Sequence, residues 1–85
     1  MELDEQVEMI QTRSDFVAFV RAIRRDLQEY PESWENLSLD RYLEALAAWT
    51  EDMDGYFLNI RGESVHEQPS WRTLGYILLA ARTYE

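Results

Sequence analysis

The stretch LDRYLEALAAWTEDMDGYFLNI, residues 39–60, decides the fold, because its apolar side chains recur at helical spacing without a break. On a helix of about 100° per residue that begins with Leu39 at 0°, Met53 lies at about 320° and Phe57 at about 0°. Leu46 falls in the same stripe. The pattern therefore predicts one long helix over these residues.

Within this stretch, DMDG (52–55) resembles the core of a calcium-binding loop. With Gly55 at loop position 6, however, Arg61 takes position 12, where an EF-hand needs a bidentate Glu. A second interpretation ends the helix at Gly55 in a left-handed cap. A third continues the helix, since Gly55 lies at about 160°, opposite the apolar stripe, where it costs only about 1 kcal/mol. We favour the continuous helix.

Helical phase also separates the two aspartates of this motif. Asp52, at about 220°, is expected in solvent, whereas Asp54, at about 60°, lies at the edge of the buried stripe. A half-buried carboxylate needs a partner. The candidates are Arg72 and the indole N–H groups of Trp34 and Trp71. We expect Asp54 to tie this helix to a neighbouring segment.

A second helix is predicted over residues 13–29, with a stripe of Phe16, Phe19, Val20, Ile23, Leu27 and Tyr30. Thr12 can cap its start together with Asp15, and Pro31 stops it because the residue before a proline resists helical geometry. Before it, Leu3, Val7 and Ile10 share one face of a short N-terminal helix, which must dock or fray.

A connector, 31–38, carries an apolar anchor, Trp34, and ends at Ser38, which can cap helix 39–60. A polar loop, 61–70, ends at Ser70, which can cap a helix over 71–84. The main face of this last helix is Leu74, Ile77, Leu78 and Ala81. Tyr76 and Leu79 point elsewhere, so the helix is either central or half of an interface. Gly75 within it suggests close approach by another helix or a large ring.

We therefore predict one all-α domain over 1–85, a compact bundle of three main helices plus a short N-terminal helix. No sustained apolar/polar alternation indicates a strand. The predicted core consists of Phe16, Phe19, Val20, Ile23, Leu27, Leu43, Leu46, Trp49, Met53, Leu74, Ile77, Leu78 and Ala81.

Composition bounds the function. Seventeen acidic residues against eight basic ones give a net charge of −9, which opposes binding to nucleic acid. No apolar run approaches the roughly 18 residues of a membrane span, and the acidic N-terminus is unlike a secretory signal, so we expect a cytoplasmic protein. With no Cys and the single His66 in a polar loop, we expect no metal, no cofactor and no catalytic constellation.

Three strings, SWEN (33–36), YLEALAAWTEDMDGYF (42–57) and PSWRTLGYILLAARTYE (69–85), resemble a family of small, uncharacterised bacterial domains. Its members carry a similar W-E-N, L-E-A-L-A-A-W, D-M-D-G-Y, P-S-W and I-L-L-A-A signature. The resemblance covers 33–85 well and 12–30 more loosely. It implies no activity, but it places in the motif Trp34, Asn36, Trp49, Asp52, Asp54, Gly55, Trp71 and Tyr84. Whether these residues serve folding or binding stays open. The candidate binding residues are Trp34, Asn36, Trp49, Asp52, Asp54 and Trp71.

These observations lead to three functional expectations. The first is a non-enzymatic, acidic protein-interaction module, in a narrower form an inhibitor or immunity-type partner of a basic protein. The second is a small-molecule site walled by the three Trp side chains, with Asp52 or Asp54 providing polarity. The third is a homodimer formed through Tyr76 and Leu79.

Overall fold

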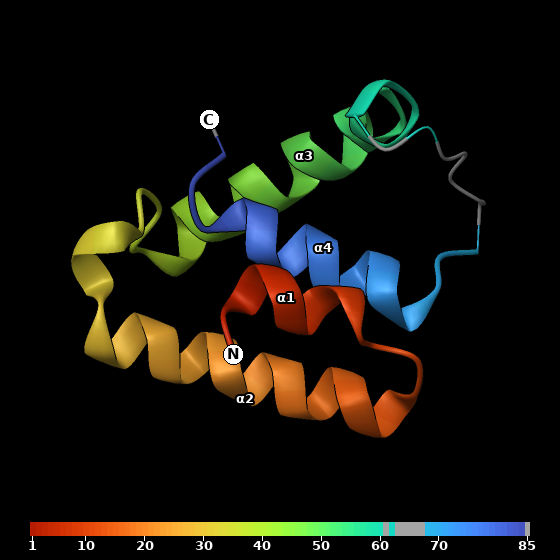
Figure 1. Cartoon of the computed structure of the whole chain (residues 1–85). Coiled ribbons are helices and arrows are strands. Elements are labelled where there is room, and N and C mark those ends of the chain that lie inside the picture. The colour runs from red at the N-terminus through yellow and green to blue at the C-terminus, as the bar shows by residue number, and fades with distance from the viewer. Residues whose placement is uncertain (61, 63–67, 85) are drawn as a thin grey trace.

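The computed structural model describes residues 1–60, 62 and 68–84, and every regular element among them is helical. The elements are α1 (Leu3–Glu8), α2 (Arg13–Glu29), the short 3-10 helix η1 (Pro31–Ser33), α3 (Leu39–Ile60) and α4 (Trp71–Ala81). Figure 1 shows α4 in the middle of the molecule, with α3 on one side and α1 and α2 on the other. The all-α prediction, three main helices plus a short N-terminal one, is confirmed.

The predicted capping side chains start the three main helices. Thr12 Oγ1 accepts from the Asp15 backbone N–H at 3.1 Å, and Asp15 Oδ2 accepts from the Thr12 N–H at 3.2 Å, which completes a capping box. Ser38 and Ser70 each accept a 3.1 Å bond from the backbone N–H three residues on. These bonds satisfy N–H groups that have no partner within the helix.

Helix α3 runs through the DMDG motif without interruption, so the calcium-loop and helix-end interpretations are both wrong. Gly55 lies on the exposed side of the helix, as its phase predicts. Gly62, beyond the end of α3, has a φ of 67°, the left-handed region that favours glycine. The predicted loop residue His66 lies outside the described residues.

The core forms where α4 meets the other three helices. Of the predicted core, Phe19, Ile23, Trp49, Ile77 and Ala81 are buried, and Phe16, Leu27, Leu46, Met53, Leu74 and Leu78 are partly buried. The predicted core lacks eight buried side chains, namely Val7, Ile10, Trp34, Ala45, Phe57, Tyr76, Leu79 and, among polar residues, Asn36.

The short α1 docks rather than frays. Val7 and Ile10 are almost fully buried, and they lie directly against Gly75 of α4. A Cβ at Gly75 would be 2.6 Å from Ile10 Cδ1 and 3.1 Å from Val7 Cγ2. The close approach predicted at Gly75 therefore exists, and α1 is the helix that makes it.

The buried side of α3 is rotated from its predicted position. On the same helical wheel it centres near Trp49, at about 280°, so that Ala45, at about 240°, is inside. Leu43, at about 40°, and Asp54, at about 60°, fall beyond the stripe and are exposed. Both had been expected inside or at its edge. Val20 of α2 is exposed for a similar reason, since the buried side of α2 is centred on Phe19 and Ile23.

The buried side of α4 is broader than the predicted main face, because it includes Tyr76 and Leu79 as well as Ile77 and Ala81. Tyr76 and Leu79 are 7% and 8% exposed, because they face into the bundle, and they are not available to a dimer interface. Leu74 and Leu78 are only partly buried. Of the alternatives left open for α4, the central position is correct, since it packs against α1, α2 and α3.

Candidate functional site

The W-E-N segment holds the C-terminal end of α4. The buried Asn36 donates from Nδ2 to the carbonyl oxygens of Ala81 at 3.0 Å and Tyr84 at 2.9 Å. The backbone N–H groups of Glu35 and Asn36 both donate to the Arg82 carbonyl at 3.0 Å. These bonds satisfy carbonyls that a helix end leaves without partners. They explain why α4 stops at Ala81, three residues before the predicted end at residue 84.

Trp34 is fixed in the same region by polar contacts. Its Nε1–H donates to Asp26 Oδ2 at 2.8 Å, and Arg82 donates to the same oxygen at 3.0 Å. The Arg82 guanidinium lies 5.9 Å from the indole centroid, a cation–π contact. Trp34 and Asn36 thus join α2, the connector and α4, so both side chains serve the fold.

Tyr42 extends this arrangement to α3. Its ring stacks on Trp34 with centroids 5.7 Å apart, and its hydroxyl donates to the Leu78 carbonyl at 2.8 Å. Burial raises the pKa of Tyr42 to about 12, because a phenolate there would lose its hydration.

The two aspartates of the motif lie on the surface of α3. Asp52 accepts a 2.6 Å hydrogen bond from the Tyr84 hydroxyl, and this bond raises the pKa of Tyr84. Asp54 is exposed, and two of the three partners expected for it, Arg72 and Trp34, are engaged elsewhere. Arg72 pairs with Glu8 at 3.4 Å, and the Trp34 indole donates to Asp26.

The structure does not bring the three Trp side chains into one cavity. Trp34 lines a groove between α2 and α3, whereas Trp49 lines a cleft between α1 and α3. Trp71 packs at the start of α4 against Phe16, with ring centroids 5.4 Å apart. The Trp-walled small-molecule site is therefore not formed.

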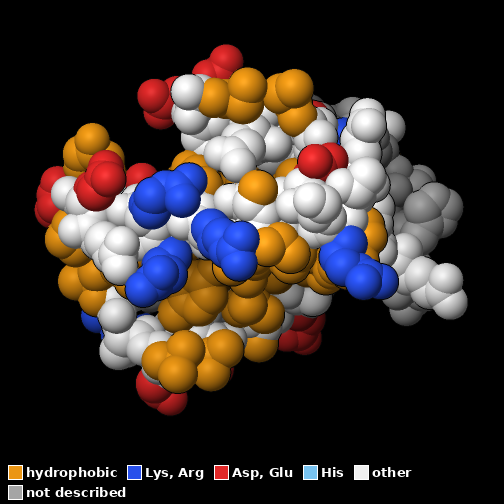
Figure 2. All heavy atoms as spheres, turned by 90° about the horizontal axis from the view of Figure 1, so that it is seen from below, with side chains coloured by type: hydrophobic (Ala, Val, Ile, Leu, Met, Phe, Trp, Pro, Cys, Tyr) orange, Lys and Arg blue, Asp and Glu red, His pale blue; other side chains and the backbone are white. Residues whose placement is uncertain are grey.

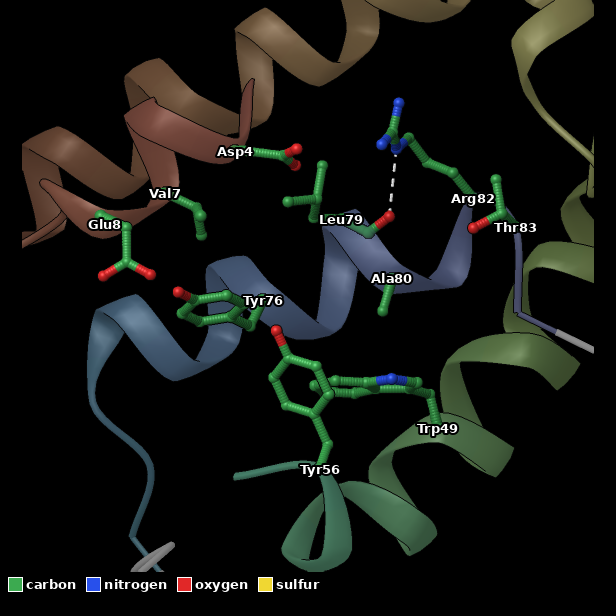
Figure 3. Close-up of a pocket in the computed structure, with 10 residues that line it drawn as sticks. All are labelled: Asp4, Val7, Glu8, Trp49, Tyr56, Tyr76, Leu79, Ala80, Arg82 and Thr83. Atoms are coloured by element: carbon green, nitrogen blue, oxygen red, sulfur yellow. Dashed lines mark hydrogen bonds between the residues drawn. The ribbon is translucent and has the colours of Figure 1, made fainter. Parts of the chain in front are cut away.

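The cleft that contains Trp49 combines charged and aromatic side chains. The backbones of helices α1 and α3 lie apart, and α4 forms the floor between them, partly through the buried Tyr76 and Leu79. Figure 3 shows Asp4 and Glu8 on the α1 wall and the Trp49 and Tyr56 rings on the α3 side. We call this hollow, of about 440 Å³, the acidic cleft, and its lining consists of Asp4, Val7, Glu8, Trp49, Tyr56, Tyr76, Leu79, Ala80, Arg82 and Thr83.

The aromatic wall of the acidic cleft is held rigidly. Tyr56 lies 5.5 Å from Trp49 and 6.3 Å from Tyr76, measured between ring centroids, and Phe57 packs edge-on behind Tyr56 and Tyr76. Aromatic faces and carboxylates both attract cations. Arg82, on the far wall, is engaged through its bonds to Asp26 and to the Leu79 carbonyl. The arrangement is suited to binding a cationic group.

Of the predicted binding residues, only Trp49 lines the acidic cleft, where it is joined by Tyr76 and Leu79, which had been predicted as interface residues. The carboxylates were missed, although Asp4 and Glu8 stand at i, i+4 on the amphipathic N-terminal segment, a spacing that places two side chains on one face. Among the described residues, no three His, Cys, Asp or Glu side chains gather as a metal site. None of the described helices has the length and hydropathy of a membrane span.

Fold and site together define a small all-α domain with a charged cleft over a central helix. The chain belongs to a family of unknown function, DUF7660, whose sequence model matches residues 12–85. This match agrees with the resemblance seen in the sequence, and α1 precedes the matched region. Neither the curated proteins nor the solved structures contain a significant match to the chain.

Proposed function

We propose that this domain is a non-enzymatic protein-interaction module that binds a basic partner through the acidic cleft. The observation that carries the proposal is the meeting of α1 carboxylates with aromatic rings of α3 and α4 in one hollow. An Arg or Lys side chain entering there would meet Asp4 on one side, beside Glu8 in its pair with Arg72, and the Tyr56 ring on the other. Charge-assisted hydrogen bonds and cation–π contacts would then add to each other.

The overall charge supports the same class of partner. A net charge of −9 produces a negative field around the domain, which would speed the approach of a basic protein and weaken with salt. An inhibitor or immunity-type role is the narrower form of the proposal. We propose a cytoplasmic setting, which a chain without cysteine permits.

The lining of the acidic cleft favours binding over chemistry. Its polar groups are carboxylates, phenol hydroxyls, Thr83 and an arginine that is already bonded to Asp26. The described lining contains no paired nucleophile and base of the kind that acyl transfer requires. A homodimer through Tyr76 and Leu79 is not proposed, because both side chains are buried.

The test is binding of an arginine-rich peptide, followed by Trp fluorescence and by amide chemical shifts. We expect binding that weakens as salt is raised, with shifts centred on Trp49 and Tyr76. Asp4→Asn/Glu8→Gln should weaken binding by about tenfold, since two charge-assisted contacts are lost. The matched control is Glu51→Gln/Asp54→Asn, which removes the same charge from exposed positions on α3. Equal weakening by both double variants would show a general charge effect and contradict a specific site.

Pull-downs from the native cell at low and high salt extend the test to the physiological partner. A basic protein recovered at low salt by the parent domain, and lost with Asp4→Asn/Glu8→Gln, is the expected result. Recovery of no partner under either condition would count against the proposal.

A further inference from the structure

The second opening over α4 lies between α2 and α3. The backbones of these two helices lie apart, and α4 contributes Leu78 to the floor between them. The resulting groove, of about 380 Å³, is lined by apolar side chains that include Val20, Leu27, Leu37, Leu39, Tyr42 and Leu78. We call it the α2–α3 groove. All of its lining residues lie within residues 12–85, the region that matches the family.

Large apolar side chains stand exposed at this groove. Leu37 and Leu39 are 56% and 71% exposed, and Leu43, one turn further along α3, is exposed as well. Val20 on the opposite wall is also exposed. Single exposed leucines are common on protein surfaces, but several that gather around one groove mark an interaction site.

The charge of the groove is opposite to that of the whole chain. Arg24 lines it, and no Asp or Glu does so among the residues that the structure describes. On α2, Arg13, Val17, Val20 and Arg24 follow one another at spacings of three or four, which places them on one side of the helix. In the view from the α2 side, Figure 2 shows apolar side chains across the face with arginines among them.

Nearby acidic residues are turned to another surface. Asp40 and Glu44, in the first turns of α3, line a separate hollow together with Arg41 and Tyr84. A chain with 17 acidic and eight basic residues therefore presents an apolar groove in which Arg24 is the charged residue among those described. This segregation selects an occupant with acidic side chains.

We propose that the α2–α3 groove binds an amphipathic helix of a protein partner, with Asp or Glu residues beside its apolar stripe. The shape favours a helix, because the groove runs between two helices over a third. α1 is an example within the same molecule, since it packs between α2 and α4 through Val7 and Ile10. Apolar residues at i, i+3 or i+4 and i+7 would meet the leucines, and the acids would meet Arg13 and Arg24.

The probe is a displayed library of helical peptides of about 16 residues, long enough for roughly four turns. Selection against the whole domain should enrich peptides with an apolar stripe and a net negative charge. Their binding should weaken as salt is raised. Failure to enrich any helical peptide, or enrichment of basic ones, would overturn the proposal.

Variants of exposed residues then locate the binding site. Leu37→Ser/Leu39→Ser and Arg24→Glu should each weaken an enriched peptide by about tenfold, the first by removing apolar contact and the second by reversing a charge. The controls are Leu58→Ser, at a leucine of α3 that is 62% exposed and outside the groove, and Arg25→Glu, which lines a different hollow. Equal effects of variants and controls would overturn the proposal.

Two further measurements separate this groove from other interpretations. Asp4→Asn/Glu8→Gln should leave peptide binding unchanged, so that failure of the acidic cleft and failure of the groove are distinguishable. Sedimentation of the domain should give the mass of a monomer over the concentrations used. A dimer that Leu37→Ser/Leu39→Ser abolishes would make a second copy the occupant and contradict the proposal.

Discussion

Asn36 shows how a single amide can hold an end of a helix. Its Nδ2 supplies both of its donors to the carbonyls of Ala81 and Tyr84, in a site that water barely reaches. Asn36→Ala would leave these acceptors without the amide, and we expect the free energy of unfolding to fall by about 2–3 kcal/mol. Urea denaturation measures the change. Asn59→Ala, at an exposed position of α3, is the control and should stay within about 0.5 kcal/mol.

Gly75 is required by the approach of α1. An added methyl group would meet Ile10 Cδ1 at 2.6 Å and Val7 Cγ2 at 3.1 Å, and both side chains are packed in the core. We expect Gly75→Ala to destabilise the domain by about 1–3 kcal/mol, despite the better helix propensity of Ala.

A double-mutant cycle between Gly75 and Ile10 tests whether this contact exists. Ile10→Val removes Cδ1, the closest atom, so Gly75→Ala should lose less stability in the Ile10→Val background than in the parent chain. The measurement is the free energy of unfolding of the parent chain, the two single variants and the double variant. Strictly additive losses would contradict the contact.

Among the helices, α3 continues through a glycine that it tolerates but does not need. Gly55 is exposed and helical, and the nearest atom to a Cβ there is Asn59 Nδ2, at 3.9 Å. Gly55→Ala should therefore raise the free energy of unfolding by about 0.5–1 kcal/mol. Gly62→Ala should lower it by about 1 kcal/mol, since a φ of 67° is strained for Ala. Thermal unfolding of the two variants gives the signs, and destabilisation by Gly55→Ala would mean that the helix ends there.

The starts of the helices and the length of α3 could be predicted because they depend on neighbours in the sequence. Thr12 and Ser70 bond to backbone groups three residues away. The helical phase of the apolar residues was enough to predict that α3 continues beyond Gly55. The orientation of each helix could not be predicted in this way. Tyr76 and Leu78 both carry a large apolar surface, and the positions of α1 and α3 decide which of them is buried.

At the scale of the molecule, three helices surround α4 and leave two openings. α1 and α2 contact each other, so the gaps fall on either side of α3. One gap carries the carboxylates of Asp4 and Glu8, and the other carries Arg24 with exposed leucines. Neither surface could be located from the sequence, because each joins residues from helices far apart in the chain. The net charge of −9 conceals this separation into two chemically different faces.

The Tyr42 hydroxyl joins α3 to α4 through its bond to Leu78, and the residue also lines the α2–α3 groove. In the unfolded chain its pKa is near the ordinary value of 10, whereas in the folded domain burial raises it to about 12. Between these values the unfolded chain loses a proton that the folded domain keeps. The stabilisation is therefore complete below pH 10 and is lost as pH rises through about 12.

Tyr42→Phe should lower the free energy of unfolding by about 1 kcal/mol at neutral pH, through the lost bond to Leu78. It should also make the decrease in stability above pH 10 less steep. Urea denaturation across this pH range measures both effects. The raised pKa of Tyr84 acts in the same direction, so Tyr84→Phe is the matched control for the slope. The buried hydroxyl of Tyr42 should account for more of the slope than the exposed one of Tyr84, since burial is the cause of its shift. An alkaline fall in stability that Tyr42→Phe leaves unchanged would contradict this assignment.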